Sequence, residues 1–361
     1  MSPTTDPRVD RRLRYLSAAD VVAAMPPLDV RLRLAEQTMV ALVADAELPP
    51  KIGVHPRPDG SFAHAMPAHL RGADPAGNDD LLGMKWIAGF PGNRARQLPA
   101  IHGLVILADP LTGVPVALLD AGPITAERTA AVSGVAIARF APVVTARPLR
   151  AALIGAGVQG RSHLPVLGHV LPGVELAIFD RHLDRARELA AEAGAIEGIA
   201  EATVSATARD AIQSADVVVT AASFGPVRQV MTPDWLTPDA LVVPIDYATY
   251  CSAAVARDAA LFLVDQREQF LANRDAGLFD DYPDPGATIG EAIVAGTARP
   301  VVGRRRWGSD KHWRADRRDG GPRGRPATAD RPHRVSRRHA HCPVRRRGAR
   351  GGSDPWAWPG G

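Results

Sequence analysis

Three glycines spaced G-x-G-x-x-G, between an apolar run and a helical pattern, constrain the fold more than any other feature of the chain. The stretch LIGAGVQG supplies Gly155, Gly157 and Gly160. Glycine allows a tight turn there and lets the backbone approach a pyrophosphate at the N-terminus of the next helix. Asp180 ends the following apolar run, where a carboxylate can accept hydrogen bonds from ribose hydroxyls. This context predicts a dinucleotide-binding unit, and a glycine turn that binds nothing is the alternative.

Residues 149–303 continue in the same style, with continuous apolar runs between helical patterns. Strands covered on both faces form unbroken apolar runs, and strand–helix alternation indicates a doubly wound α/β fold of the Rossmann type. Ligands bind outside the carboxyl ends of such strands. Ser223, Asp246 and Asp265 each follow an apolar run and are therefore candidate site residues, with Asp265 the weakest. A helix cap or a surface-loop carboxylate is the alternative for Asp246.

Residues 13–148 read as a separate α+β unit. SAADVVAAM and VRLRLAEQTMVALVADA have helical spacing, and Ser17 is a suitable cap for the first of them. Five short strand-like runs follow, and the last two are joined by a hairpin signal at 109–113. Thr125 is expected to cap the next helix, AERTAAVSGVAIARF.

Two cations of this first unit are candidate substrate ligands. Lys85 lies inside the apolar run LLGMKWIAGF, and a buried amine is costly unless it faces a partner, a ligand or a cleft. Arg128 is expected at about the third position of the helix after Thr125, where free N–H groups and a guanidinium together form a carboxylate site. The alternatives are a lysine on a solvated strand face and a surface arginine paired with Glu127 or Asp120.

The charge of the chain is distributed unevenly. Residues 304–361 hold 17 Lys+Arg and 5 Asp, a net +12, whereas the other 303 residues carry a net −8. The segment has no Leu, Ile, Met, Phe or Tyr and no helical or strand period, which predicts disorder. One interpretation is a basic arm that binds polyanions such as nucleic acid. The other, which we favour, is a shifted reading frame in a GC-rich gene, because the change of pattern is abrupt.

Several classes of protein are excluded by simple counts. No stretch reaches about 18 uninterrupted apolar residues, so no transmembrane helix is expected. The N-terminus has no apolar core of a signal peptide, and two cysteines are too few for a disulfide framework or a cysteine-rich metal site. We therefore expect a cytoplasmic enzyme without a metal site.

Several stretches together resemble the ornithine cyclodeaminase/mu-crystallin family. They are AMPAHL (65–70), GMKWIAGFPGN (83–93), LADPLTGVPVALLDAGPITAERTAAVSGVA (107–136), IGAGVQG (154–160) and GEAIVAG (290–296). The resemblance implies a substrate domain that forms a homodimer, beside a Rossmann domain that binds NAD or NADP. It also implies hydride transfer at the α-carbon of a small amino or imino acid.

The resemblance implies roles for individual residues. Lys85 matches the family's catalytic lysine, Arg128 its carboxylate-binding arginine and Asp246 its proton-shuttling acid. Lys51 stands where the family commonly has an arginine, which replaces a bidentate contact by a point charge. The residues expected to contact the cofactor are Gly155, Gly157, Val158, Gln159, Gly160, Asp180, Arg181 and Ser223.

The sequence alone does not decide between NAD and NADP or between the possible reaction types. Asp180 favours NAD, while the neighbouring Arg181 keeps NADP open. The main hypothesis is a redox-neutral cyclodeaminase that passes through an iminium. The alternatives are a ketimine reductase or an alanine-type dehydrogenase with net redox, and an inactive nucleotide-binding protein, since the family's C-terminal segment is replaced here by the Arg-rich stretch.

Overall fold

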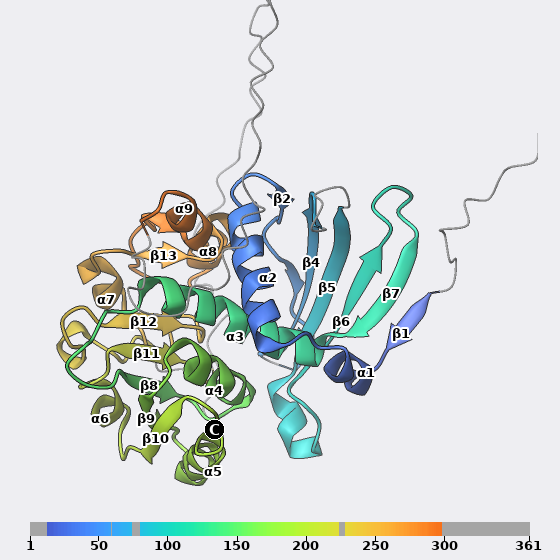
Figure 1. Cartoon of the computed structure of the whole chain (residues 1–361). Coiled ribbons are helices and arrows are strands. Elements are labelled where there is room, and N and C mark those ends of the chain that lie inside the picture. The colour runs from blue at the N-terminus through green and yellow to red at the C-terminus, as the bar shows by residue number, and fades with distance from the viewer. Residues whose placement is uncertain (1–12, 59, 74–79, 224–227, 298–361) are drawn as a thin grey trace, which may run out of the picture. The chain divides into compact units, whose positions relative to one another are not determined.

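A computed structural model describes residues 13–58, 60–73, 80–223 and 228–297 (Figure 1). Both interpretations of the segment 304–361, and the disorder predicted for it, lie outside these residues. In the described part, no helix is long and apolar enough to cross a membrane.

The first sheet is seven-stranded and mostly antiparallel. Its order is β1-β7-β6-β5-β4-β2, and β3 also pairs with β4. The strands are β1 (Arg14–Leu16), β2 (Ala46–Glu47), β3 (Ile52–Val54), β4 (Phe62–Leu70), β5 (Leu81–Gly89), β6 (Ile101–Ala108) and β7 (Pro115–Asp120). The predicted hairpin joins β6 to β7, and Gly113 takes the positive φ of +72° that its turn requires.

Strand register sets the two faces of this sheet. Lys85 and Ile87 point to one face and Trp86 to the other, because side chains alternate along a strand. Gly103 pairs with Ile87, and a Cβ on Gly103 would lie 3.3 Å from the Cβ of Ala121. The helix that contains Ala121 therefore covers the face to which Lys85 points.

Three helices accompany the first sheet: α1 (Ala18–Ala23), α2 (Leu28–Ala41) and α3 (Ala121–Phe140). Ser17 caps α1 in a capping box, as predicted. The predicted start of α3 is wrong. The helix begins at Ala121, and the Asp120 carboxylate caps it by accepting from Gly122 N. Pro123 fits the first turn because no N–H is needed there.

The second sheet is a parallel, doubly wound Rossmann sheet with the order β10-β9-β8-β11-β12. Its elements are β8 (Arg150–Ile154), α4 (Val158–Val170), β9 (Val174–Phe179), α5 (Leu183–Ala193), β10 (Ile199–Val204), α6 (Ala208–Ile212), β11 (Val217–Thr220) and β12 (Leu241–Pro244). The central strands β8 and β11 are almost completely buried, which explains their unbroken apolar sequences. The predicted fold class is confirmed.

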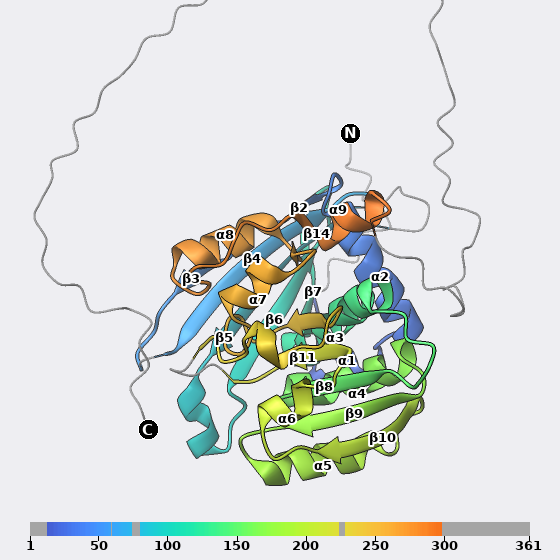
Figure 2. The same ribbon diagram turned by 90° about the vertical axis from the view of Figure 1, so that its left-hand side faces the viewer.

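The segment after β12 leaves the parallel sheet. It contains α7 (Ala253–Asp258), β13 (Leu263–Val264), α8 (Arg267–Asp275), β14 (Ala287–Thr288) and α9 (Ile289–Val294). β13 pairs only with β14, so the expectation that Asp265 ends a strand of the Rossmann sheet is wrong. In this segment α8 lies beside β3 (Figure 2), and Gln269 Oε1 accepts from Lys51 N at 2.8 Å.

Helix α3 connects the two sheets (Figure 1). It packs against α2 on one side and α4 on the other, with contacts to β6 and β12. Gly134 lies at this crossing, where a Cβ would come 2.5 Å from Leu32 Cδ2 and 2.7 Å from Val166 Cγ1. The close approach of three helices at Gly134 therefore holds the sheets together.

Candidate functional site

The glycine turn has the geometry that its spacing predicts. A Cβ on Gly155 would lie 2.5 Å from Ala221 O, and one on Gly160 would lie 2.1 Å from Gly155 O. These two glycines are required for packing. A Cβ on Gly157 would meet nothing within 4 Å, so the backbone of this N-cap residue of α4 faces open space. A phosphate can approach the helix N-terminus there.

Asp180 anchors the turn and borders a cavity. Its Oδ2 accepts from Ala156 N at 2.8 Å, and its Oδ1 accepts from His182 N at 2.8 Å. The adjoining cavity has a volume of about 340 Å³ and is lined by Asp180, Arg181, His182, Arg185, Ser223 and Tyr250, among others. The cavity therefore combines one carboxylate with two guanidinium groups.

The residues of this turn fit a dinucleotide. Gln159 Oε1 is buried beside the turn without a hydrogen-bond partner, and α4 has no side-chain cap on its first N–H groups. Val158, the first residue of α4, is 69% exposed although it is apolar. Uncapped N–H groups at a helix N-terminus are what the anionic part of a cofactor would cover, whereas the Gln159 oxygen could accept only from a donor group such as a hydroxyl or an amide.

Asp246 is buried where the parallel strands end. It is 2% exposed, accepts from Thr220 Oγ1 at 2.8 Å through Oδ1, and receives Ala222 N at 3.3 Å on Oδ2. Burial raises the pKa of Asp246 to about 6, although these hydrogen bonds oppose the rise. Both the helix cap and the surface-loop carboxylate are thereby excluded, and the group is suited to exchange protons near neutral pH.

The predicted substrate cations lie together on the other side of the site. Burial, together with the charges of Arg128 and Lys51, lowers the pKa of Lys85 to about 7. In the described part of the chain, Lys85 and Arg128 have neither a hydrogen bond nor an ion pair within 4.0 Å. Crowded cations without partners form a site for an anion.

The position of Arg128 within its helix differs from the one predicted from the sequence. It is the eighth residue of α3, so it does not lie beside the free N–H groups of the helix start. Glu127 pairs instead with Arg31, and Asp120 caps the helix, which excludes both alternative partners. Desolvation by neighbouring protein atoms lowers the pKa of Arg128, although the residue keeps exposed surface.

Three side chains of the site were missed by sequence reasoning. Tyr247 accepts a hydrogen bond from Lys51 Nζ at 2.8 Å and is close enough to Arg128 to affect its pKa. His64 shares the Lys85 face of the sheet, and Thr125 Oγ1 is buried without a partner on α3. For Tyr247 the only available signal was its position directly after Asp246 in the sequence.

The structure brings some predicted residues together and leaves others apart. Lys51, Lys85 and Arg128 form one electrostatic group, and Asp265 interacts with Arg128 from the loop after β13. Asp246 interacts with Tyr250 rather than with these cations. Tyr247, which follows Asp246 in the chain, contacts Lys51 of the cation group.

A Rossmann sheet with a glycine turn, joined to a mixed sheet that carries a group of cations, is the arrangement of a class of dinucleotide-linked enzymes acting on small acids. Residues 17–269 match the model of the ornithine cyclodeaminase/mu-crystallin family, and the chain belongs to that family.

Two relatives of known name show how similar this chain is to other members of the family. The nodulation efficiency protein NfeD of Rhizobium meliloti is 38% identical over 259 residues, 69% of this chain and 76% of that protein. The mouse ketimine reductase mu-crystallin is 26% identical over 64% of this chain and 70% of its own length.

Solved structures that resemble this chain are also NAD-linked enzymes of amino and imino acids. The Thermococcus litoralis Δ1-pyrroline-2-carboxylate reductase in complex with NADH and L-proline is 26% identical, with a TM-score of 0.66 over 79% of this chain and 87% of that one. An archaeal alanine dehydrogenase dimer with bound NAD is 26% identical, with a TM-score of 0.64 over 79% and 86% of the two chains. The expected family of NAD(P)-dependent amino-acid and imino-acid enzymes is confirmed.

Proposed function

We propose that this protein catalyses hydride transfer between NAD(P) and the α-carbon of a small amino or imino acid. The observation that carries the proposal is the group of Lys85, Arg128 and Lys51, two of which have no partner in the described structure. Such a group requires an anion, and a substrate carboxylate supplies one.

The substrate would be held by its carboxylate. Arg128 offers two parallel N–H donors and Lys85 a point charge, so the carboxylate is fixed in one orientation. Lys51, tied through Tyr247 and Gln269, completes the group. The α-carbon would then face the carboxyl ends of the parallel strands, and positioning of this kind accounts for much of catalysis in cofactor enzymes.

The cofactor would lie along the glycine turn. Gly155, Gly157, Val158, Gln159 and Gly160 would hold the pyrophosphate, and Ser223 would line the adjoining cavity. When bound, the nicotinamide supplies the hydride chemistry. Asp180 would accept hydrogen bonds from the ribose hydroxyls of NAD, whereas Arg181 would pair with the 2′-phosphate of NADP. The proposal therefore includes both NAD and NADP as cofactors.

Asp246 would hold the proton that moves with each turnover. Its pKa of about 6 lets the group take a proton from a substrate amine or return one to an imine near neutral pH. Thr220 and Ala222 N would keep the carboxylate oriented. The relative named L-lysine cyclodeaminase leaves redox-neutral cyclisation as the second candidate reaction.

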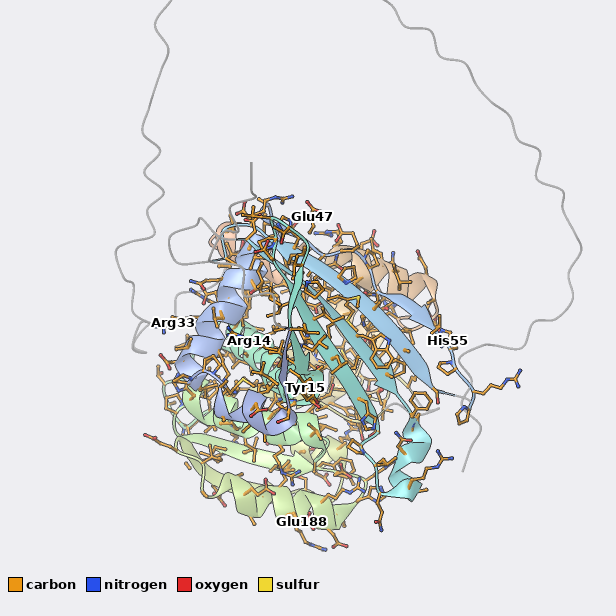
Figure 3. All side chains as sticks on the ribbon, turned by 90° about the vertical axis from the view of Figure 1, so that its right-hand side faces the viewer. Arg14, Tyr15, Arg33, Glu47, His55 and Glu188 are labelled. Carbon is orange, nitrogen blue, oxygen red and sulfur yellow. The ribbon has the colours of Figure 1, made fainter. Side chains whose placement is uncertain are left out.

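A homodimer is part of the proposal. The sheet face opposite Lys85 carries exposed apolar side chains, among them Tyr15 (63%), Ile52 (69%) and Trp86 (41%). Figure 3 shows the sheet from this side, with Tyr15 labelled on β1. A contiguous exposed apolar face of this kind marks an interface, and a two-fold dimer would cover it with a copy of itself. The archaeal alanine dehydrogenase neighbour is a dimer.

The two units of the chain would have separate roles. Residues 13–148 would bind substrate and form the dimer, and 149–303 would bind the dinucleotide. A cytoplasmic location fits an enzyme of this family. An inactive nucleotide-binding protein is disfavoured by the unpartnered Lys85 and Arg128 beside the strand ends.

Cofactor binding tests the proposal independently of the substrate. NADH and NADPH titrations of the full chain, followed by quenching of protein fluorescence, should show saturable binding. Gly157→Val should weaken it by about tenfold or more, because the side chain fills the phosphate approach, while leaving thermal unfolding unchanged. Gly92→Ala, at a glycine also open to solvent, should bind normally. Absence of binding to the wild-type chain would refute the proposed function.

A further inference from the structure

A fully buried histidine lies in the contact between α3 and α4 (Figure 1). His163, on α4, is 0% exposed, and its Nε2 lies 2.9 Å from Oγ of the buried Ser133 on α3. Its Nδ1 lies 2.6 Å from Gln159 O, one turn earlier on α4. One residue away, at Gly134, the neighbouring packing is apolar. The proposed function leaves this buried polar pair without a role.

The chemistry of the two partners determines which nitrogen of His163 carries the proton. Gln159 O is a carbonyl oxygen and can only accept, so Nδ1 carries the proton and donates to it. Burial lowers the pKa of His163 to about 4, although the hydrogen bond to Gln159 opposes the change. The imidazole is therefore neutral near pH 7, and Nε2 accepts a hydrogen bond from Ser133 Oγ.

The pair lies between two parts of the proposed site. Gln159 belongs to the glycine turn at the start of α4, where the cofactor would bind. On α3, Ser133 Oγ also lies 3.2 Å from Thr129 O, and Thr129 directly follows Arg128. A continuous hydrogen-bonded path therefore runs from the cofactor turn, through His163, to the helical turn that carries the Arg128 guanidinium.

Neither neighbour depends on His163 for a hydrogen-bond partner. Gln159 O also accepts from Ser162 Oγ at 3.0 Å, and Ser133 Oγ can donate to Thr129 O instead. An apolar side chain of similar size at this position would therefore leave no buried group unsatisfied, and its effect on stability would be small. What the polar pair adds is a directional bond that fixes how α4 is set against α3, where apolar contacts tolerate sliding.

The setting of these two helices matters for hydride transfer. In the proposed function the N-terminus of α4 places the cofactor, and Arg128 on α3 places the substrate carboxylate. A misplacement of about 1 Å between reacting atoms can cost about 100-fold in rate. A small shift of α4 along α3 would therefore slow the transfer without preventing either molecule from binding.

We infer that His163 is a positioning residue, which through its hydrogen bond with Ser133 holds the cofactor turn in a fixed setting against the helix that carries Arg128. The inference rests on the proposed function and goes beyond it, because His163 is fully buried and acts only through Gln159 and Ser133.

His163→Leu tests the inference by removing the bond while keeping most of the side-chain volume. With NAD(P)H and Δ1-pyrroline-2-carboxylate, the full chain should lose about tenfold or more in kcat, with little change in KM or in NAD(P)H affinity. Single-turnover rates with cofactor deuterated at the transferable position should give an isotope effect that varies more steeply with temperature than in wild type. A purely structural role would lower stability and leave the isotope effect unchanged. His169→Leu, at an exposed histidine of the same helix, is the control and should resemble wild type.

Further variants separate the hydrogen bond from the bulk of the side chain. His163→Gln can place an amide donor near the position of Nε2, so it should bond Ser133 and recover most of kcat. His163→Asn is too short to reach α3 and should stay as slow as His163→Leu. Ser133→Ala removes the same bond from the other helix, and adding it to His163→Leu should cause little further loss. If His163→Leu does not fold, Ser133→Ala and His163→Gln still decide.

Two results would overturn the inference in different ways. Wild-type kcat and an unchanged isotope effect in both His163→Leu and Ser133→Ala would refute it and leave hydride chemistry at the α-carbon intact. Bound cofactor without turnover in the wild-type chain would refute the proposed function and the inference together.

Discussion

At the scale of single residues, Lys85 is the most direct test of the site. Lys85→Ala removes a crowded cation that has no partner in the described structure, so kcat/KM should fall by about 100- to 1000-fold. NAD(P)H affinity should be unchanged, because the glycine turn is untouched. Arg71→Ala, which removes an exposed cation paired with Glu47 on the same sheet, serves as the control. Wild-type turnover in Lys85→Ala would remove this residue from the mechanism.

The pKa values of Asp246 and Lys85 predict a bell-shaped pH profile for amine oxidation and a falling one for imine reduction. Amine oxidation needs Asp246 ionised and Lys85 protonated, so kcat/KM should rise as pH passes about 6 and fall as it passes about 7. Imine reduction needs both groups protonated, so its kcat/KM should fall steadily as pH rises from 5 to 8. Steady-state rates in both directions give the profiles, and a flat response in both would contradict the assignment.

Residue identities could be predicted where a local pattern carries the chemistry. The spacing of Gly155, Gly157 and Gly160 and the position of Asp180 follow from one strand–turn–helix unit. Tyr247 could not be predicted, because its contact with Lys51 depends on a left-handed backbone and on two segments far apart in the chain.

At the scale of elements, α3 determines how the two sheets are joined. Even a Cβ on Gly134 would lie within 2.7 Å of atoms of Leu32 and Val166, and Gly134→Val adds two methyl groups beyond it. This overpacking should destabilise the protein by about 1–3 kcal/mol. Denaturant unfolding measures the change. Gly92→Ala, with no atom within 4 Å, should stay within about 0.5 kcal/mol of wild type. A neutral Gly134→Val would show that the helix crossing is looser than described.

Element boundaries were harder to predict than element types. Thr125 resembled a helix cap, but Asp120 competes for that role and starts α3 earlier, which moves Arg128 away from the helix N-terminus. Leu263 and Val264 read as another strand of the parallel sheet, yet they pair with β14. The first case is decided by a competing local cap and the second by pairing between segments apart in the chain.

At the scale of the whole molecule, the uncovered sheet face predicts the assembly. Trp86→Glu would bury a charge in the proposed interface and should convert the homodimer to a monomer. Leu111→Glu, at an apolar residue that is 93% exposed on the hairpin between β6 and β7, should leave the dimer intact. Light scattering after size-exclusion chromatography gives the two masses. A wild-type monomer would refute the dimer.

Hydride transfer at the α-carbon of an acid held by Lys85 and Arg128 is the central step of the proposed function. Its most direct test uses NADH or NADPH deuterated at the transferable position, mixed with the full chain and Δ1-pyrroline-2-carboxylate, with the product examined by mass spectrometry and NMR. The account predicts proline with one deuterium on the α-carbon. Product without deuterium there, or none at all while cofactor is bound, would contradict it.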